Sequence, residues 1–392
     1  MRSQAHSLLA AALMSTARAA QHGLIVGNFV QGSLYSVTFD DETFELELVG
    51  NTTVPAPSSW LSWSHDKKTL YGTNYTYIND QQDLTIPPTY MSFAVDNLTT
   101  ISHQTTLKGR DGCNGSAIYI EALKVEPYTV YGFDYWGTPG CGQVMSVDKN
   151  GALDEVIQDF DYWPESGVHG SAFNKDQTLL YAADTLGNAI WTQPIDPETG
   201  KLGEPIDITM GPNDHAEPRH VILHTSGNAL YAVMEGSNEM GWYEIDHCTQ
   251  KPKLKGAFDL LPEELLGSEN HWANEVVVSP SGKYVWSTTR GRGGGDDTGF
   301  ISVFDADPKT GAILRQNFLR PTLTSGGVAN VVIPSEFDDR IIALTDNAIG
   351  FIEIWQLAED GNWAEPVNRL LLSDQGNSRY ASGCCANAVW LD

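Results

Sequence analysis

The stretch HTSGNALYAV (residues 224–233) decides the fold, because closely similar stretches recur along the chain. Each stretch starts with turn-forming residues and continues into a short apolar strand that carries an aromatic side chain. The other members are SHDKKTLYGT (64–73), NKDQTLLYAA (174–183), SPSGKYVWST (279–288) and, more weakly, VEPYTVYGFD (125–134). A turn and strand repeated in this way predict a fold that is assembled from copies of one β unit.

The aromatic residues of the repeats give the period. They stand 60, 50, 50 and 55 residues apart, at Tyr71, Tyr131, Tyr181, Tyr231 and Trp286. Short strands with a period near 50 are typical of a β-propeller in which each repeat is one four-stranded blade. Seven units of about 53 residues fill the roughly 372 residues that follow an N-terminal leader. We therefore predict an all-β, seven-bladed β-propeller that forms a single domain over residues 21–392.

The rest of the chain agrees with a closed ring of blades. Helical periodicity is poor almost everywhere, and LLPEELLG (260–267) is one short helical turn at most. GLIVGNF (23–29) has the pattern of a strand with no hairpin partner before it, and CCANAVWLD (384–392) has the pattern of a final strand. Pairing of these N- and C-terminal strands would close the ring and remove its exposed edges. An array of β-sandwiches is the alternative, but it gives no reason for so regular a spacing.

The charge balance excludes two classes of partner. The chain has 392 residues, of which 41% are hydrophobic and 19% charged, and its net charge is -27. A surface this acidic repels nucleic acid and anionic membranes, so we expect neither as a partner. After the N-terminus no segment reaches the roughly 18 uninterrupted apolar residues of a membrane span.

The N-terminus has the features of a secretory signal. It combines a basic start at Arg2, an apolar run over 8–14 and the small-residue sequence ARAA. We predict a signal peptide over residues 1–20, cleaved near Ala19 or Ala20, and the alternative is an irregular N-terminal helix of a cytosolic protein. Four N-x-[ST] sequons favour a secreted glycoprotein, and they lie at Asn51, Asn74, Asn97 and Asn114.

The chain has five cysteines, which in an oxidising compartment allow two disulfides and one remaining thiol. Cys113 and Cys141 are the best candidates for a pair, because both lie in Gly-rich loops that flank one strand pair. No zinc-type cysteine spacing occurs. His220 and His224 are four residues apart, but they lie in a strand-like run rather than on a helix. We therefore expect no metal site and no cofactor.

The register of the repeats selects the candidate site. His169, Arg219 and Asn274 each lie 12 residues before the aromatic residue of their repeat. Glu235 and Arg290 each lie four residues after it. Equivalent positions of a propeller form a ring about its axis, and positions that serve packing should repeat one residue type. These positions differ and are mostly ionisable, which predicts an axial site for an anionic or oxygen-rich small molecule.

Each of these residues also has a structural interpretation. A histidine beside glycine is often a satisfied structural residue, and Arg219 could pair at the surface with Glu217 or Asp214. Glu235 and Arg290 could form an ion pair between neighbouring blades. The chain contains neither a strand–GxxxxGK[ST]–helix motif nor G-x-S-x-G, so the sequence supports neither nucleotide hydrolysis nor a serine-esterase site.

These stretches resemble the fungal 3-carboxy-cis,cis-muconate cyclase family, within the seven-bladed lactonase propellers that include 6-phosphogluconolactonases. The resemblance runs from about residue 125 to the C-terminus, through SGVHGSAF, YAADTLGNAIWT, EPRHVILHTSGNALYAVMEGSN, SPSGKYVWSTTR, SGGVANVV and NAVWLD. It implies that His169, Arg219, Glu235 and Arg290 are active-site groups. The chain departs from the cyclase pattern at Val328, where that pattern has a polar residue, typically histidine.

Two reactions fit such a quartet, and neither needs a metal. In lactone hydrolysis, His169 or Glu235 would activate water and an arginine would stabilise the oxyanion. In lactonisation, Arg219 and Arg290 would hold carboxylates while His169 or Glu235 moves the proton. The expected export favours hydrolysis of sugar-acid lactones over the cyclase reaction. A third hypothesis is a non-catalytic secreted glycoprotein or adhesin on the same scaffold.

Overall fold

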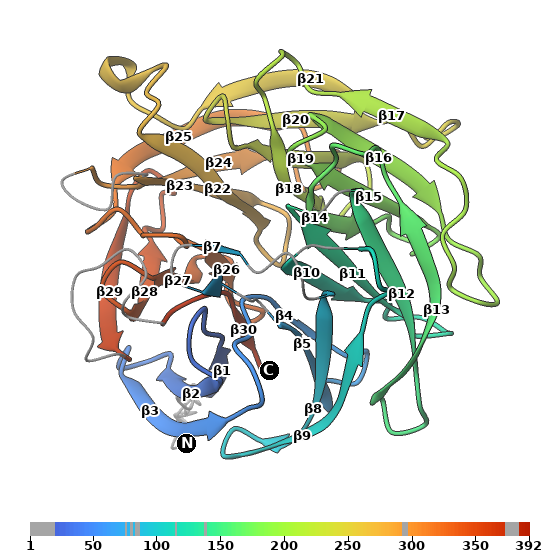
Figure 1. Ribbon diagram of the computed structural model, residues 1–392. Helices are drawn as coiled ribbons and strands as arrows, with labels where there is room; N and C mark the ends of the chain where they lie inside the picture. Colours follow the sequence, from blue (N-terminus) through green and yellow to red (C-terminus); the bar gives the residue numbers. More distant parts are fainter. Residues whose placement is uncertain are drawn as a thin grey trace, which may run out of the picture.

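The protein is a ring of seven four-stranded antiparallel sheets around a central axis, as Figure 1 shows for the computed structural model. The structure describes residues 20–74, 77–78, 81–82, 87–113, 116–136, 139–291, 297–372 and 384–392, with the backbone alone for 77–78 and 81–82. The predicted seven-bladed β-propeller is therefore confirmed.

Each blade has four strands in order from the axis outward. The first three blades are β4 (Leu61–Trp63), β5 (Thr69–Asn74), β8 (Thr89–Asn97) and β9 (Thr100–Lys108); β10 (Ser116–Ala122), β11 (Val130–Tyr135), β12 (Cys141–Val147) and β13 (Leu153–Asp161); and β14 (Val168–Phe173), β15 (Leu179–Asp184), β16 (Ala189–Pro194) and β17 (Asp207–Met210). A two-stranded sheet joins β6 (Tyr77–Ile78) and β7 (Gln81–Gln82).

The next three blades follow the same order. They are β18 (Pro218–Leu223), β19 (Ala229–Met234), β20 (Glu239–Ile245) and β21 (Pro252–Asp259); β22 (His271–Val278), β23 (Tyr284–Gly291), β24 (Phe300–Ala306) and β25 (Ile313–Pro321); and β26 (Val332–Pro334), β27 (Ile341–Asp346), β28 (Phe351–Leu357) and β29 (Ala364–Leu371). A 3-10 turn, η1 (Glu263–Leu265), lies in the segment that sequence analysis limited to one helical turn.

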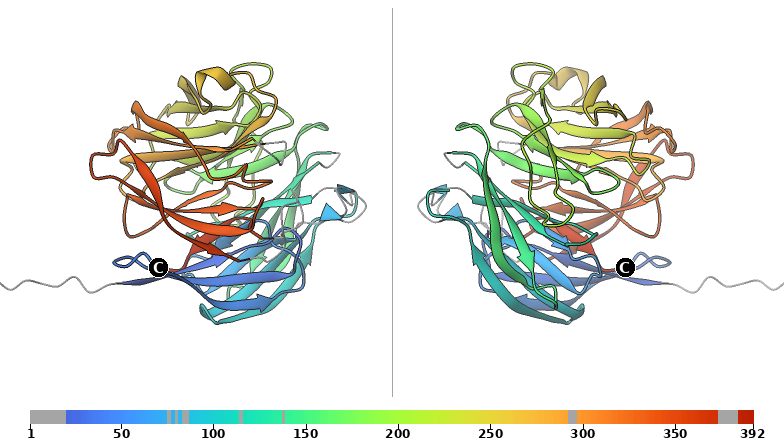
Figure 2. Two further views of the ribbon diagram at one scale, coloured as in Figure 1. Left: turned by 90° about the vertical axis from the view of Figure 1, so that its left-hand side faces the viewer. Right: turned by 90° about the vertical axis from the view of Figure 1, so that its right-hand side faces the viewer.

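Strands from both ends of the chain build the seventh blade. Its order from the axis outward is β30 (Ala388–Trp390), β1 (Gln21–Val26), β2 (Ser33–Asp40) and β3 (Leu46–Thr53). β30 and β1 pair antiparallel, with Leu24 opposite Trp390, which is the closure expected from the sequence. The side views of Figure 2 place the C-terminus against the blue strands of this blade.

The repeated tyrosines connect neighbouring blades. Each lies in the second strand of its blade, is buried, and donates its hydroxyl to a backbone carbonyl of the next blade. The four pairs are Tyr71 with Gly151, Tyr131 with Gly200, Tyr181 with Gln250 and Tyr231 with Gly311, at 2.5–3.1 Å. The sequence repeat therefore marks a repeated contact between blades, in which an apolar ring fills the core and its hydroxyl is satisfied.

One β-bulge recurs in the innermost strands of four consecutive blades. The pairing register skips a single residue there, and these residues are Ile118, His169, Arg219 and Asn274. The last three are the residues that the sequence alignment made equivalent, so their equivalence is confirmed in the structure. Because a bulge re-aims a side chain, it sets these residues apart from the regular ladder.

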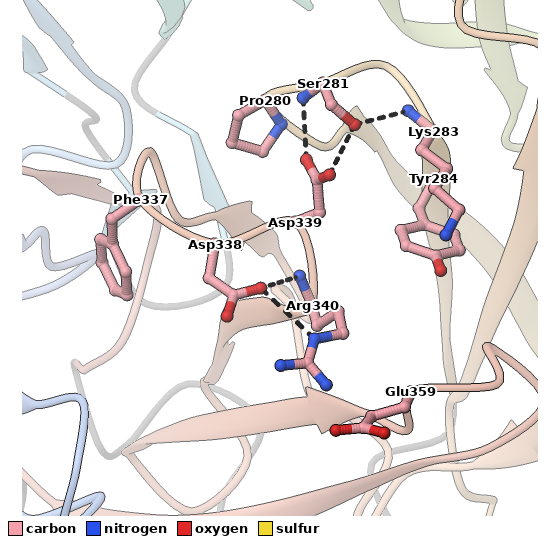
Figure 3. Close-up of a pocket in the computed structure, with 9 residues that line it drawn as sticks. All are labelled: Pro280, Ser281, Lys283, Tyr284, Phe337, Asp338, Asp339, Arg340 and Glu359. Carbon is pink, nitrogen blue, oxygen red and sulfur yellow. Dashed lines mark hydrogen bonds and ion pairs between the residues drawn. The ribbon is translucent and has the colours of Figure 1, made fainter. Parts of the chain in front are cut away.

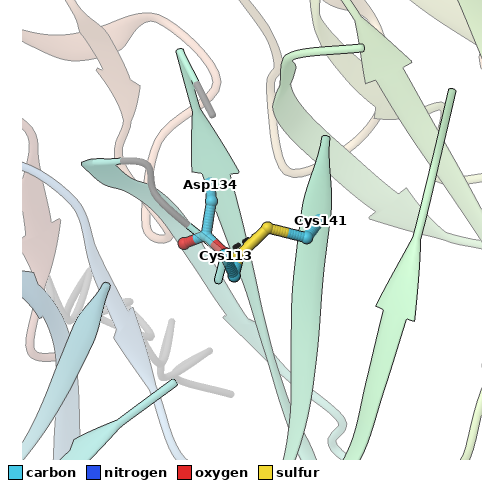
Figure 4. A group of neighbouring side chains, drawn as sticks. All are labelled: Cys113, Asp134 and Cys141. Carbon is cyan, nitrogen blue, oxygen red and sulfur yellow. Dashed lines mark hydrogen bonds between the residues drawn. A yellow bond between two sulfur atoms is a disulfide. The ribbon is translucent and has the colours of Figure 1, made fainter. Parts of the chain in front are cut away.

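The predicted disulfide between Cys113 and Cys141 is present in the second blade, beside Asp134 (Figure 4). Cys384 and Cys385 form another disulfide, and Cys248 is an exposed free cysteine. Cys113, Asp134 and Cys141 are the only metal-type cluster in the described part of the chain, and two of its members are joined in that disulfide.

The predicted signal peptide lies outside the described residues except for Ala20. Among the sequons, Asn51 and Asn97 are exposed, Asn74 is half-buried and Asn114 is outside the described residues. Within the described ranges, no helix has the length and apolar character required to cross a membrane.

Candidate active site

The five predicted site residues come from three consecutive blades and are all buried. His169 lies on β14, Arg219 on β18 and Asn274 on β22, each at the bulge, while Glu235 follows β19 and Arg290 is near the end of β23. Their exposed fractions run from 0% for Asn274 to 7% for Glu235 and Arg290. A cluster this buried depends on pairing among its own members.

Glu235 joins the two arginines. Its Oε2 atom lies 2.7 Å from Nε of Arg219 and 3.2 Å from Nη2 of Arg290. Arg219 also donates to the backbone carbonyl of Asn274, and Arg290 donates from Nη1 to the carbonyl of Val328 at 2.6 Å. The ion pair that sequence analysis allowed between Glu235 and Arg290 is therefore present, and Val328 contributes its backbone at the position where the cyclase pattern has a polar side chain.

The side chain of Asn274 has polar atoms without partners. Neither Oδ1 nor Nδ2 has a hydrogen-bond partner among the described residues, although the residue is fully buried. A buried amide left unsatisfied costs about 1–3 kcal/mol of stability. Such a group beside Arg219 is suited to bind a ligand that supplies the missing partners.

His169 has a neutral ring at pH 7. Burial, reinforced by the charges of Arg219, His220 and Arg290, holds the pKa of His169 well below its ordinary value of 6.5. Its Nδ1 atom lies 2.9 Å from Nε2 of His220, and the ring of Tyr135 meets it edge-on at 5.1 Å between centroids. A neutral imidazole beside two guanidinium groups can accept a proton from a substrate or from water.

Three residues around this cluster, Tyr135, His220 and Glu275, were not predicted as site residues, and His220 had been considered only as a metal ligand. Tyr135 lies four residues after Tyr131, so the offset that selected Glu235 and Arg290 would have found it. His220 and Glu275 each follow a bulge residue directly, and they share a contact of 2.6 Å between Nδ1 and Oε2.

His220 and His224 take separate partners. The Nε2 atom of His224 lies 2.8 Å from the carbonyl oxygen of Gly282, and its Nδ1 lies 2.8 Å from Oγ of Ser226. The ring of His220 is engaged by His169 and Glu275. Each of the two histidines therefore serves its own local hydrogen-bond network.

A separate surface pocket of about 570 Å³ lies beside the turn between β22 and β23 (Figure 3). Lys283, Arg340 and Glu359 line it, together with Asp338 and Asp339. Asp339 accepts hydrogen bonds from Ser281, and Asp338 pairs with Arg340. None of the predicted site residues borders this pocket, and much of its charge is paired locally, so it is not a second candidate for the chemistry.

A seven-bladed ring whose two inner strands per blade and their ends bring a histidine, two arginines and a glutamate together is typical of a propeller enzyme of the lactonase class. The chain belongs to the family described as "Lactonase, 7-bladed beta-propeller", whose model matches residues 23–367. The family resemblance stated from the sequence is confirmed.

Two similar proteins are named as muconate-converting enzymes, and a solved structure of the same fold is named as a gluconolactonase. The chain is 31% identical to a carboxy-cis,cis-muconate cyclase of Neurospora crassa over 95% of its own length and 99% of the relative. It is 27% identical to muconate cycloisomerase 1 of Cutaneotrichosporon cutaneum, over 94% of this chain and 98% of that one. Among solved structures, the periplasmic gluconolactonase of Pseudomonas aeruginosa has the same fold, with a TM-score of 0.77 at 17% identity over 95% of this chain and 99% of that one.

Proposed function

We propose that the protein hydrolyses lactones of small sugar acids, with His169 as the general base and Arg219 and Arg290 as the groups that stabilise the oxyanion. The observation that carries this proposal is the neutral, buried imidazole of His169 close to two arginines. Hydrolysis starts with removal of a proton from water, which a neutral imidazole performs and an imidazolium does not.

The proposed hydrolysis has two steps, attack of water on the lactone carbonyl and opening of the ring. His169 takes a proton from water as the water oxygen bonds to the lactone carbonyl carbon, and the carbonyl oxygen becomes an oxyanion. The guanidinium groups, already fixed by Glu235 and by backbone carbonyls, stabilise that charge without reorganising. The ring C–O bond then breaks, and the leaving oxygen receives the proton from His169, which gives an open-chain hydroxy acid.

Glu235 is better suited to hold the arginines than to move a proton. A single oxygen, Oε2, contacts both guanidinium groups, so the carboxyl group is already engaged in holding the two arginines in place. The side chain of Asn274 completes the proposed site as a binding group for a substrate oxygen, since its amide has no partner among the described residues.

The cyclase reaction is the second candidate. It is favoured by the 31% identity to the Neurospora crassa cyclase across nearly the whole of both chains. In that reaction a carboxylate oxygen adds to one carbon of a double bond and a proton is added to the neighbouring carbon. Arg219 and Arg290 suit the carboxylates of such a substrate, but the neutral ring of His169 must first acquire the proton that it delivers.

We further propose that the protein is exported and glycosylated. The signal-like N-terminus and the exposed Asn51 and Asn97 support this proposal. Export would bring the enzyme to sugar-acid lactones outside the cell, whereas a non-catalytic adhesin would have no need for a buried quartet of ionisable groups.

One pair of incubations tests the function. The purified protein is incubated with glucono-δ-lactone, with acid release followed at constant pH, and with 3-carboxy-cis,cis-muconate, with ultraviolet absorbance followed over time. We expect acid release above the spontaneous rate that is lost in the H169A variant. Turnover of the muconate alone would establish the cyclase instead, and no turnover of either would favour the adhesin.

A further inference from the structure

His220 lies where side chains from five blades meet. It extends from β18, and its ring contacts Trp60 before β4, Tyr119 of β10, His169 of β14 and Glu275 of β22. Residues from so many blades can meet only around the axis of the ring. His220 is 2% exposed, and Trp60 and Tyr119 both meet its ring at steep angles, which leaves the two ring nitrogens to polar neighbours, chiefly His169 and Glu275.

The contacts of Glu275 and His220 show which atom donates and which accepts each hydrogen bond. The Oε1 atom of Glu275 accepts the backbone N–H of Val276 at 3.1 Å, and Oε2 lies 2.6 Å from Nδ1 of His220. A carboxylate offers only acceptors, so the proton of that contact belongs to Nδ1 of His220. Arg219 offers only donors, and its Nη1 lies 3.5 Å from Nε2 of His220, so Nε2 is an acceptor.

The same direction continues to His169. Since Nε2 of His220 accepts, the proton in its 2.9 Å contact with His169 belongs to Nδ1 of His169. A neutral His169 then carries its lone pair on Nε2, which has no hydrogen-bond partner among the described residues. Burial keeps the pKa of both histidines below 6.5, which agrees with two neutral rings.

Gly170 makes this contact sterically feasible. Residues directly after the bulge are Tyr119, Gly170, His220 and Glu275, so Gly170 is the only member of the set without a side chain. A Cβ atom at Gly170 would lie 2.7 Å from Cδ2 of His220 and 3.0 Å from the carbonyl oxygen of Arg219. The ring of His220 therefore occupies the space that any larger residue at 170 would fill.

We propose that Glu275 and His220 are positioning residues that fix the tautomer of His169, so that Nδ1 donates to His220 and Nε2 is left as the base. This inference rests on the proposed role of His169. Glu275 and His220 do not belong to the quartet of His169, Arg219, Glu235 and Arg290. The inference also states which ring nitrogen of His169 carries the proton. Orientation of a catalytic histidine by a hydrogen-bonded carboxylate has a known counterpart in serine hydrolases, although here a second histidine stands between the two groups.

The Glu275→Gln substitution is the sharpest test, because it nearly preserves size while reversing the hydrogen bonds. The glutamine oxygen keeps the place that accepts the Val276 N–H, so its NH₂ group faces Nδ1 of His220. Nδ1 must then accept, Nε2–H of His220 donates to His169, and His169 carries its proton on Nε2. We expect turnover of glucono-δ-lactone to fall by ~10²–10⁴-fold with little change in KM.

The tautomer is read directly by nuclear magnetic resonance of the full protein with ¹⁵N-labelled histidine rings. Long-range ¹H–¹⁵N correlation at pH 7.5 should show the proton of His169 on Nδ1 in the parent and on Nε2 in E275Q. The signals are assigned by their loss in H169Q and H220Q. A purely structural role for Glu275 would lower the melting temperature but would not move this proton.

Two glycine substitutions, one as the test and one as the control, check the inference independently of Glu275. Gly170→Ala should displace His220 and reduce turnover by ~10²-fold, the effect of a misplacement of about 1 Å at a reacting centre. Gly256→Ala is the matched control, because its new Cβ would meet only ordinary contacts at 3.6 Å or more. G256A should retain the parent's turnover.

The outcomes separate this inference from the proposed function. A parent protein that carries the His169 proton on Nε2, or an E275Q variant with unchanged tautomer and turnover, would overturn the positioning role. If the parent shows the Nδ1 tautomer and E275Q reverses it, the positioning arrangement stands even if neither the lactone nor the muconate is turned over. In that last case only the choice of reaction fails.

Discussion

Arg219 and Glu235 form an ion pair of 2.7 Å between two side chains that are each at most 10% exposed. Arg290, from the next blade, shares the same carboxylate oxygen. Two guanidinium groups thus contact one carboxylate oxygen, and such a group of arginines suits an anion or a developing oxyanion. The first three predictions below concern this cluster.

The Glu235→Gln substitution should lower stability more than it alters the chemistry. It removes the carboxylate that two buried arginines share, and breaking a buried ion pair costs about 3–5 kcal/mol. Urea unfolding of E235Q should show a reduced midpoint with an unchanged slope. A variant that keeps the parent's stability but loses turnover by ~10²–10⁴-fold would instead identify Glu235 as the proton-transfer group.

The pH dependence of hydrolysis should reflect the depressed pKa of His169. A base must be unprotonated to act, and burial together with Arg219 holds the pKa of His169 below 6.5. The acid limb of kcat/KM should therefore lie below pH 6.5, with full activity persisting at pH 6.5 and above. H169A should lose ~10²–10⁴-fold in kcat and show no such limb, and a limb centred above pH 7 would argue against His169 as the base.

The Arg219→Lys substitution distinguishes the two candidate reactions. Lysine keeps the charge but loses the planar fork that binds Glu235 and the Asn274 carbonyl together. For a carboxylate substrate we expect mainly a higher KM, because a ground-state anion loses a bidentate partner. For a neutral lactone we expect mainly a lower kcat, because only the oxyanion of the transition state is affected. If R219K and the parent have equal KM and kcat values, Arg219 does not take part in the reaction.

Asp134 should give stability a pH dependence of unusual sign for an aspartate. Burial raises the pKa of Asp134 from 3.8 to about 7, and its Oδ2 lies 2.9 Å from the disulfide sulfur of Cys113. Between pH 4 and 7 the folded state therefore binds a proton that the unfolded state has released, so this contribution to stability is lost as the pH rises.

The Asp134→Asn variant tests this linkage, because asparagine imitates the protonated form. The difference in unfolding free energy between D134N and the parent should shift in favour of D134N as the pH rises from about 4 to about 7. It is measured by denaturant titration at each pH. A constant difference across that range would show that Asp134 is ionised throughout.

Local pattern explains why the sequence predicted so much of the fold. Turn residues followed by an aromatic strand are encoded within ten residues, and each tyrosine keeps its place because it fills a core and bonds to the next blade. Three of the four bulges also lie 12 residues before the tyrosine or tryptophan of their repeat, so His169, Arg219 and Asn274 could be aligned without a structure.

Contacts between blades explain what the sequence did not predict. His220 meets His169 across 51 residues and Glu275 across 55, and the first contact depends on the missing side chain at Gly170. The backbone of Val328 supports Arg290, although the side chain at this position had suggested a departure from the family. Such contacts depend on the angle between neighbouring sheets, which no single repeat encodes.

Closure of the ring makes folding of this protein dependent on β30. The innermost strand of the seventh blade is β30, Ala388–Trp390, and until these residues leave the ribosome β1 has an unpaired edge. Blades three to five, which carry the candidate site, are synthesised earlier, but we expect an open arc not to hold them at their final angles. Loss of residues 388–392 should therefore leave a chain with an adhesive strand edge and an incomplete axis, whose site residues are all present in the sequence but are not held together.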